Sequence, residues 1–246
     1  MAAHGVHLKR PRRVRSERRP FPAWADYERN SIWIYDVTHF AGCPKHAVFA
    51  VMDLVTRKWI TGLVSIEETS TQVQVVFIDA LELEGLLELV EARQDAPARD
   101  LPFPAAQDVL APVLLAVSDN GPQMTSCSTR EFMAMCAIAQ QFGRPGTPTD
   151  QAWIESLFGH VKADWPHLDR ICDPEVLRGE LAVVRHEYNT VRLHAGIGYV
   201  TPADEHDGRG EKIRAARKRG LRQACWARIA YHRIQQAKRR SAADMD

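Results

Sequence analysis

Three short segments near the start of the chain are rich in β-branched and aromatic residues. They span residues 31–40, 46–55 and 58–66, and the turn-forming residues 42–45 and 56–57 separate them. Short apolar segments divided by such turns are typical of consecutive strands. The pattern therefore predicts three successive antiparallel strands.

Apolar residues change to helical spacing after Thr69. They recur three or four positions apart as far as Val90, which predicts a helix packed on the sheet. Residues 92–112 then contain four prolines, which forbid a continuous helix and indicate a loop or an insertion. The apolar run 113–121 predicts a fourth strand that ends at Asp119.

The rest of the pattern predicts helices joined by short connections. In chain order these are a helix at 131–142, a loop at 143–148, a helix capped by Thr149 and Asp150 that ends near Asp164, and a last helix at 174–193. A very short fifth strand has room only at 144–147. Antiparallel strands followed by parallel strands and helices predict an α/β fold with a mixed sheet flanked by helices.

The composition is that of a globular protein. At 246 residues and 45% apolar content, the chain is long enough for one domain with its own core plus extensions. It contains no run of ~18 apolar residues and no apolar segment after its basic N-terminus, so we expect a cytoplasmic protein without a membrane partner. Its five cysteines lie far apart without a CxxC pair, which argues against a zinc site or a disulfide framework and favours buried free thiols.

The charge is unevenly distributed although the net charge is only +1. Residues 9–19 carry seven Lys and Arg against one Glu, and residues 209–240 carry twelve against one Glu. Basic arms on an acidic body suit a polyanionic partner, and the alternative is that they are solvated, disordered tails. We predict a basic N-terminal arm at 1–29, a catalytic core at 30–205 and a basic C-terminal extension at 206–246.

Three acidic residues stand out by their positions. Asp36 lies within the first predicted strand, Asp119 ends the fourth, and Glu155 lies near the start of a helix. Taken singly, they have ordinary explanations as an ion-paired strand residue, a turn residue and a solvated helix residue. Together they predict an oxygen-rich site for Mg²⁺, in which two ions activate a water or a DNA 3′-hydroxyl for attack on a phosphodiester.

The helix that carries Glu155 has two distinct faces. Ile154, Leu157, Phe158 and Val161 form an apolar stripe for the core, while Gln151, Glu155, Gly159 and Lys162 occupy a different face. Lys162 is two turns after Glu155, where it can meet a DNA phosphate, and Gly159 leaves room for a backbone to approach. The alternative is that Lys162 is a plain surface lysine without a role in DNA binding.

A set of motifs covers about residues 30–204. They are W-x-x-D-x-T at 33–38, V-x-D-x-x-x-R at 51–57, S-D-N-G-x-Q-x-T-S at 118–126, D-x-A-x-x-E-S-x-F-x-x-x-K at 150–162, Y-N-x-x-R-x-H at 188–194 and the pair Thr201-Pro202. With these motifs the chain resembles the integrase-core domain of bacterial insertion-sequence DDE transposases, which are relatives of retroviral integrases.

The resemblance implies an RNase H-like fold and a polynucleotidyl transferase that cleaves and joins DNA at mobile-element ends. It implies that Asp36, Asp119 and Glu155 are both the catalytic residues and the ligands of two Mg²⁺ ions, for which Mn²⁺ can substitute. The residues expected to contact DNA or to support the site are Lys162, Asn120, Gln151, Arg192 and His194. We expect a bacterial, nucleoid-associated homo-oligomer whose partners are element-end and target DNA.

The chain also departs from the family pattern. Gln151 stands where members usually carry Asn, and the segment 143–148 is richer in proline and glycine than its counterpart. Only about 30 residues precede the first strand, so we expect a separate helix-turn-helix protein, encoded upstream, to recognise the element ends. The rival hypothesis is a catalytically silent, truncated transposase fragment that acts as a DNA-binding or inhibitory partner. A structure-selective nuclease is a third hypothesis.

Overall fold

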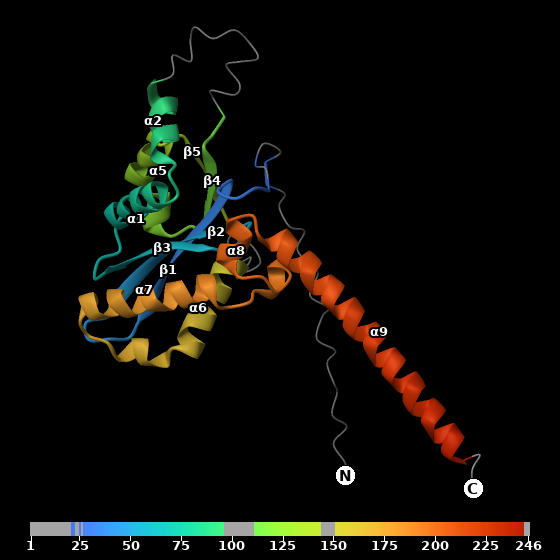
Figure 1. Ribbon diagram of the computed structural model, residues 1–246. Helices are drawn as coiled ribbons and strands as arrows, with labels where there is room; N and C mark the ends of the chain where they lie inside the picture. Colours follow the sequence, from blue (N-terminus) through green and yellow to red (C-terminus); the bar gives the residue numbers. More distant parts are fainter. Residues whose placement is uncertain (1–20, 23–24, 26, 96–110, 144–150, 244–246) are drawn as a thin grey trace, which may run out of the picture.

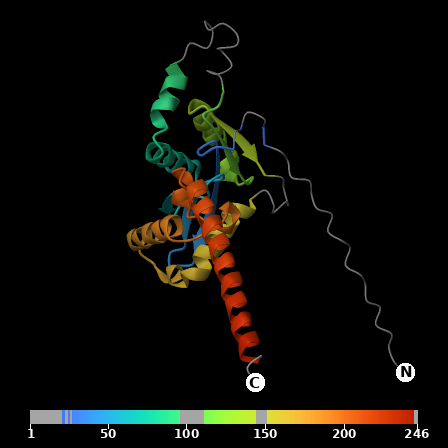
Figure 2. The same cartoon turned by 45° about the vertical axis from the view of Figure 1, so that its right-hand side comes forward.

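The computed structural model describes residues 21–22, 25, 27–95, 111–143 and 151–243. Within these residues a five-stranded sheet, ordered β3-β2-β1-β4-β5, carries helices on both faces (Figures 1 and 2). The strands are β1 Ile32–Phe40, β2 His46–Asp53, β3 Trp59–Ser65, β4 Leu114–Ser118 and β5 Ile138–Phe142. The first three are antiparallel, and β4 and β5 run parallel to β1. The predicted mixed α/β sheet is confirmed.

Helices cover both faces of this sheet, and the last of those described, α9 (Gly210–Ala243), extends away from it (Figures 1 and 2). The α-helices are α1 Ser70–Leu83, α2 Leu87–Asp95, α4 Pro122–Thr125, α5 Cys127–Met135, α6 Ala152–Asp164, α7 Pro174–Thr190, α8 Pro202–His206 and α9 Gly210–Ala243. The described residues also form the 3₁₀ turns η2 Pro166–Arg170 and η3 Ala195–Ile197. Across the described part of the chain, none of these helices combines the length and the apolar character needed to cross a membrane.

The alternation of side chains along β1 separates two cores. Ile32 and Ile34 join the core on the face covered by α6 and α7, whereas Trp33 and Tyr35 join the core under α1 and α5. Successive strand residues point to opposite faces, so a strand with apolar residues at every position must be covered on both sides. On the α1 face, the Phe77 ring packs against Tyr35 with the centroids 4.8 Å apart.

The predicted helix at 131–142 is wrong in its second half. The helix α5 ends at Met135, Ala137 takes a left-handed conformation with φ 52°, and the following residues form β5. The strand β5 pairs in parallel with β4, from Leu114↔Ile138 to Ser118↔Phe142. Residues 138–142 therefore form a strand because the edge of β4 offers them backbone hydrogen bonds. We expected the fifth strand at residues 144–147, which lie outside the described residues. The structure instead places it earlier, at Ile138–Phe142.

The helix predicted at 174–193 is confirmed as α7, but it is not the last helix. The helix α7 ends at Thr190, and α8 and α9 follow it. His206 of α8 is buried in the core, while α9 extends away from the body of the molecule (Figures 1 and 2). Part of the basic C-terminal extension is thus a long helix rather than an unstructured tail.

Two smaller predictions also need correction. The loop expected from residue 92 begins later, because α2 continues to Asp95. Cysteines expected to be buried are mostly exposed: Cys136 is buried, whereas Cys43, Cys127, Cys172 and Cys225 lie at the surface as free thiols. Hydrophobic pattern does not distinguish these positions, because they lie in turns, at a helix start and on α9. The predicted caps Thr149 and Asp150 and most of the predicted arm 1–29 lie outside the described residues.

A buried polar network ties the C-terminal segment to the sheet. Asp53, which is fully buried at the end of β2, accepts hydrogen bonds from the backbone N–H groups of Asn30, Val55 and Thr56 at 2.5, 2.7 and 2.8 Å. Burial raises the pKa of Asp53, although these N–H groups oppose that shift. The Thr56 hydroxyl is in turn hydrogen-bonded to His206 Nδ1 at 3.0 Å. Asp53 of the 51–57 motif therefore shapes the turn between β2 and β3.

Glu84, just after α1, completes this network. Its two carboxylate oxygens accept hydrogen bonds from His206 Nε2 and Lys58 Nζ, each at 2.7 Å, and from Asn30 Nδ2 at 3.0 Å. Burial alone raises the pKa of Glu84, but these three donors lower it to about 2. The carboxylate is therefore ionised and fully engaged, and it joins three segments that are distant in sequence.

Candidate active site

Two carboxylates leave adjacent strands on the same face of the sheet. The strands β1 and β4 are parallel, with Ile32 opposite Leu115 and Ile34 opposite Val117. Asp36 and Asp119 each stand two residues beyond the last of these pairs. Side chains two residues apart share a face, so both carboxylates are on the side of Ile34 and Val117, which α6 and α7 cover. Pairing of β1 with β4 therefore brings together two acids 83 positions apart.

The turn after β4 holds Asp119 in place. Its Oδ1 accepts a hydrogen bond from the Gly121 backbone N–H at 2.9 Å. A Cβ at Gly121 would stand 3.1 Å from that same oxygen, so a larger residue would crowd the carboxylate. The Asn120 side chain donates to the Gly143 carbonyl at 2.7 Å, which ties the end of β4 to the end of β5. Asn120, expected to contact DNA or to support the site, therefore has a structural partner.

The helix α6 presents Glu155 beside these strands. Its apolar stripe Ile154, Leu157, Phe158 and Val161 is buried as predicted. Glu155 and Gly159 are exposed, and a Cβ at Gly159 would meet nothing within 4 Å. The protein's own packing therefore does not require glycine there, which leaves an open strip of helix surface one turn after Glu155.

Asp36 is the carboxylate with the most perturbed titration in this group. Its pKa is raised to about 6, mainly by burial, with further contributions from the negative charges of Asp119 and Glu155. A hydrogen bond from the Val37 backbone N–H, 2.7 Å long, opposes this shift. The three acids therefore lie near enough to repel one another. Among the residues that the structure describes, however, no three Asp, Glu, His or Cys side chains are arranged to hold a metal ion.

Lys162 lies at the other end of the contact between α6 and β1. Its ammonium group stands 5.6 Å from the ring centroid of Phe40, the last residue of β1. Phe40 is four residues beyond Asp36 and therefore on the same face. Lys162 is half-buried, so it differs from a plain surface lysine, and its contact with a phosphate stays a prediction.

Gln151, directly before α6, carries a buried side chain without a visible partner. It is 7% exposed, and within the described part of the chain neither its amide nitrogen nor its oxygen has a hydrogen-bond partner. Its backbone carbonyl accepts from the Glu155 N–H at 3.1 Å, which fixes the first turn of the helix. A buried amide costs about 1 to 3 kcal/mol when unpaired, so its position next to Glu155 suits a group that gains a partner on binding.

Comparison with known proteins identifies the family. A model of the integrase core domain matches residues 26–148, which is half of the chain, and a second integrase core model matches residues 137–202. The chain belongs to the integrase core domain family. The two matches meet at β5, and together they include Asp36, Asp119 and Glu155.

Curated relatives of this integrase core come from bacterial insertion elements. A protein of insertion element IS476 from Xanthomonas euvesicatoria is 30% identical over 86 residues, or 35% of this chain and 25% of that protein. The transposase of insertion sequence IS904 from Lactococcus lactis is 27% identical over 96 residues, or 38% of this chain and 37% of the transposase. The matched region thus spans about a quarter to two fifths of each of these relatives.

Solved structures support the fold of the integrase core. The HTLV-2 integrase catalytic core domain in complex with magnesium aligns with a TM-score of 0.50 and 19% identity, over 73% of this chain and 97% of that one. A chain of the simian T-cell lymphotropic virus intasome, solved with a regulatory subunit of PP2A, gives a TM-score of 0.51 and 17% identity, over 74% of this chain and 55% of that one. The RNase H-like fold expected from the motifs is confirmed.

The motif at 188–194 of the integrase core has a clear packing role in its first half. The Asn189 side chain accepts from the Trp59 backbone N–H and donates to the Trp59 carbonyl, both at 2.9 Å, and so clamps α7 to β3. Tyr188 is buried with its ring edge-on to Trp59. These two residues therefore hold the layers together rather than contact a substrate.

The second half of this motif lies in a basic region near α6. Arg192 forms an ion pair with Asp164, 2.7 Å long, at the end of α6. His194 Nδ1 accepts from the Gly196 backbone N–H at 3.1 Å. Burial lowers the pKa of His194, and the positive charge of Arg57 lowers it further. Both predicted support residues thus have partners within the protein, and both lie in a region of positive potential.

Arg57 is a member of this basic region that sequence reasoning left out of the site. Its guanidinium lies 4.9 Å from the ring centroid of Trp153, two residues before Glu155. Its backbone is left-handed, with φ 65°, in the turn that Asp53 organises. The available signal was its place at the end of the 51–57 motif, but only the packing of that turn against α6 brings it against Trp153 in the first turn of that helix.

Proposed function

We propose that this chain is the catalytic core of a transposase, which cuts and joins DNA strands at the ends of an insertion element. In this proposal Asp36, Asp119 and Glu155 hold two Mg²⁺ ions, and Mn²⁺ substitutes for them. The observation that carries it is the pair of acids on adjacent parallel strands, with α6 laid on the same face. Membership of the integrase core family and the insertion-element relatives support the same reaction.

The donor set fits a hard divalent cation. All three side chains offer carboxylate oxygens, which Mg²⁺ prefers. Burial is the main cause of the raised pKa of Asp36, and the negative charges of Asp119 and Glu155 add to it, so a cation bound there would lower the pKa. Bound Mg²⁺ would activate a water or a 3′-hydroxyl and stabilise the leaving oxygen. The chain itself orients Asp119 through Gly121 and Asn120, and it keeps Glu155 on an exposed face of α6.

The surroundings of the acids supply contacts for a DNA backbone. Lys162 lies on the same face of α6 as Glu155, two turns further along. Arg57 lies beside the first turn of that helix, and Arg192, which pairs with Asp164, and His194 extend the basic region towards its end. Gln151 offers a buried amide with donor and acceptor capacity. We propose that phosphates approach along the open strip at Gly159, where no side chain intervenes.

Partners of this reaction follow from its geometry. Joining two element ends requires two active sites in one assembly, so we propose a homo-oligomer that binds both ends and target DNA. Since the matched region spans only part of each curated relative, we further propose that a helix-turn-helix protein, encoded upstream, supplies recognition of the end sequence.

The direct test is strand cleavage and joining. Labelled duplex carrying the terminal sequence of the element is incubated with the purified chain and Mg²⁺ or Mn²⁺, with and without the upstream protein. We expect nicked and joined products with wild type, and none with Asp119→Asn. The matched control is Glu88→Gln, which removes an exposed carboxylate of α2 and should leave the yield unchanged. Full activity of Asp119→Asn would refute the assignment.

Metal binding is testable without catalysis. A ligand that binds only the folded state stabilises it by about 2.7 kcal/mol at a hundred times its dissociation constant. Thermal unfolding should therefore shift upward with Mg²⁺ or Mn²⁺ in wild type and in Glu88→Gln. The shift should be lost in Asp119→Asn, and its persistence there would place the metal elsewhere.

One observation favours a second candidate, a catalytically silent core that binds DNA only. The described residues contain no preformed group of three metal-binding side chains, and Glu155 is exposed. In that case the chain binds duplex DNA, shows no metal-dependent stabilisation, and yields no product even with the upstream protein. The two experiments above separate these candidates.

A further inference from the structure

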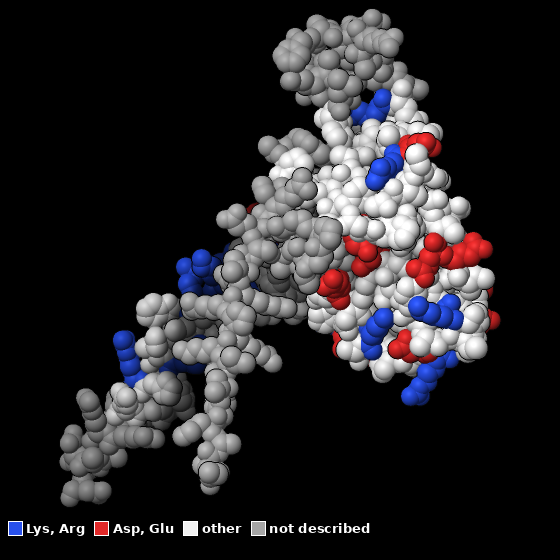
Figure 3. All heavy atoms as spheres, turned by 180° about the vertical axis from the view of Figure 1, so that it is seen from behind, with Lys and Arg blue, Asp and Glu red and all other residues white. Residues whose placement is uncertain are grey.

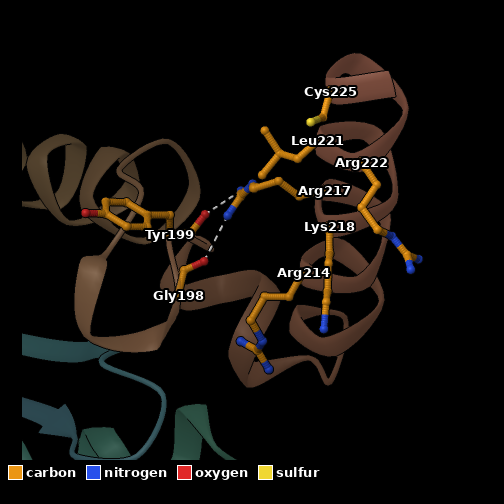
Figure 4. A pocket seen from close by; sticks show the side chains of 8 residues that line it. All are labelled: Gly198, Tyr199, Arg214, Arg217, Lys218, Leu221, Arg222 and Cys225. Atoms are coloured by element: carbon orange, nitrogen blue, oxygen red, sulfur yellow. Dashed lines mark hydrogen bonds between the residues drawn. The ribbon is translucent and has the colours of Figure 1, made fainter. Parts of the chain in front are cut away.

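The long helix α9 is anchored to the body only by its first turns. Arg214 pairs with Glu205 at 2.5 Å and donates to the Ile197 carbonyl at 2.9 Å. Arg217 donates to the carbonyls of Gly198 and Tyr199 at 2.8 and 2.6 Å, as Figure 4 shows. These arginines are therefore used to dock the helix.

Beyond this anchor the described side chains of the helix are uncovered as far as residue 234. Its 34 residues correspond to a length of about 50 Å. Side chains from 215 to 234 are all exposed, and they include Trp226, which is 68% exposed, and Ile229, which is 37% exposed. Most helices owe their stability to packing of one face, so an uncovered helix of this length indicates a surface that meets a partner.

One face of α9 combines arginines with two apolar side chains. Arg219, Arg222, Trp226, Ile229 and Arg233 follow one another at alternating spacings of three and four, which places them in a single row along the helix. We call this row the basic stripe. Among the described residues, none of its three arginines has a hydrogen bond or an ion pair with another side chain. The charges of the stripe are therefore uncommitted.

The charge of the helix selects the class of partner. Within its described side chains, α9 carries eight Lys and Arg and a single acid, Glu211. In Figure 3 blue Lys and Arg mark α9, whereas acidic side chains are frequent on the body. A second copy of the helix would set arginine against arginine along the stripe, which disfavours a coiled coil. A membrane surface requires separate apolar and basic faces, whereas here arginines flank Trp226 and Ile229 on the same face.

Duplex DNA fits this arrangement. The three arginines span 14 residues, or about 21 Å of helix, and the major groove of B-DNA is about 12 Å wide. Arginines at both ends of the stripe can therefore reach phosphates on both sides of the groove, while Trp226 and Ile229 face the groove between them. We propose that the basic stripe of α9 binds the phosphate backbone of duplex DNA, as a contact separate from the carboxylate site. This inference rests on the proposed function, because that function supplies DNA as the partner.

The test compares two arginines of one helix. Binding of the full chain to a fluorescent 30-base-pair duplex is measured by anisotropy over a series of salt concentrations, with EDTA present so that no chemistry occurs. Arg222→Gln removes a charge of the stripe, and Arg228→Gln removes an equal charge from another face of α9. Gln keeps helix propensity, and circular dichroism checks the fold.

We expect Arg222→Gln to weaken binding roughly 3- to 10-fold and to lower the slope of log K against log salt by about 0.9. Arg222→Gln/Arg233→Gln should lower the slope by about twice as much, and Arg228→Gln by much less. Equal losses for Arg222→Gln and Arg228→Gln would overturn the stripe in favour of diffuse charge attraction. Unchanged DNA binding in the double variant, with a changed oligomeric state or lost binding to anionic vesicles, would overturn it in favour of another partner.

The outcome is independent of the catalytic proposal. Glu88→Gln should bind the duplex as wild type does, because this exposed residue of α2 belongs to neither the stripe nor the carboxylate site. If Asp119→Asn cuts DNA normally, the metal site is wrong while the stripe stands. If the stripe variants bind normally but Asp119→Asn is inactive, the stripe is wrong while the proposed function stands.

Discussion

Acidic side chains at two places on the same sheet have opposite electrostatics. Glu84 is buried among donors, and His206, Lys58 and Asn30 lower its pKa to about 2. Asp36 is partly buried with two other acids for neighbours, and its pKa is raised to about 6. The residue types are alike, so the difference comes from what surrounds each carboxylate.

This contrast separates a structural carboxylate from one that we propose binds a cation. Hydrogen bonds compensate the ionised Glu84, and it links the end of α1 to α8 and to the turn before β3. Repulsion at Asp36 destabilises the folded state without cations, and a bound cation relieves it. Strain of this kind is kept in a fold when it serves a function. Substitutions in the carboxylate site and in the Glu84 network should therefore have different effects on activity and stability.

The largest effect is expected from Glu155→Gln. It removes the helix carboxylate from the proposed metal site, and loss of several kcal/mol of transition-state stabilisation corresponds to roughly a thousand-fold lower rate. Strand joining with Mg²⁺ measures the rate, while thermal unfolding should be unchanged because Glu155 is exposed. Glu131→Gln, at an exposed position of α5, is the control. A loss smaller than ten-fold would remove Glu155 from the catalytic set.

On the structural side, Glu84→Gln should lower the free energy of unfolding by about 3 kcal/mol at pH 7, because Lys58 and His206 lose their buried anionic partner. The folded pKa of Glu84 lies below its ordinary value of 4.5. Its ionised form therefore stabilises the fold fully above pH 4.5, and this contribution is lost as the pH falls towards 2. Urea unfolding from pH 7 to 3 should show wild type and variant converging. Parallel curves would mean that Glu84 acts through packing alone.

Without metal, Asp36→Asn should raise the free energy of unfolding, whereas Glu84→Gln should lower it. The folded pKa of Asp36, about 6, lies above the ordinary value of 3.8, so the folded state binds the proton more tightly than the unfolded chain. Ionisation therefore destabilises the fold as the pH rises from 3.8 through 6. With EDTA, the variant should be about 1 to 3 kcal/mol more stable than wild type at pH 8, and this difference should narrow towards pH 4. A variant less stable at pH 8 would contradict the repulsion.

The smallest effect is expected from Gly159→Ala, which should change the free energy of unfolding and DNA cleavage in opposite directions. Gly159→Ala adds a methyl group where nothing lies within 4 Å, and alanine favours a helix by about 0.5 to 1 kcal/mol over glycine. Urea unfolding should show that gain, while DNA cleavage should fall if a phosphate backbone approaches this strip. Gly179→Ala on α7, also with open space, should give the gain without the loss. Equal activity of both variants would show that DNA does not pass Gly159.

Local pattern predicted most of what positions the site. Strands β1 to β4 follow from apolar runs and turns, and the stripe of Ile154, Leu157, Phe158 and Val161 fixed which side of α6 is buried. Motif spacing pointed to Asp36, Asp119 and Glu155 together. These features succeed because side-chain periodicity is a property of neighbouring residues.

Pairing and docking decided the rest. Residues 138–142 continue the spacing of a helix, yet they form β5 because β4 offers an open edge. The contact of Arg57 with Trp153 depends on a turn packing against a helix almost a hundred residues away. The sequence by itself determined the alternation of faces and pointed to Asp36, Asp119 and Glu155 as the candidate acids. Only the tertiary structure decided which strands are neighbours, which carboxylates find donors and which arginines of α9 stay uncommitted, because these properties depend on groups distant along the chain.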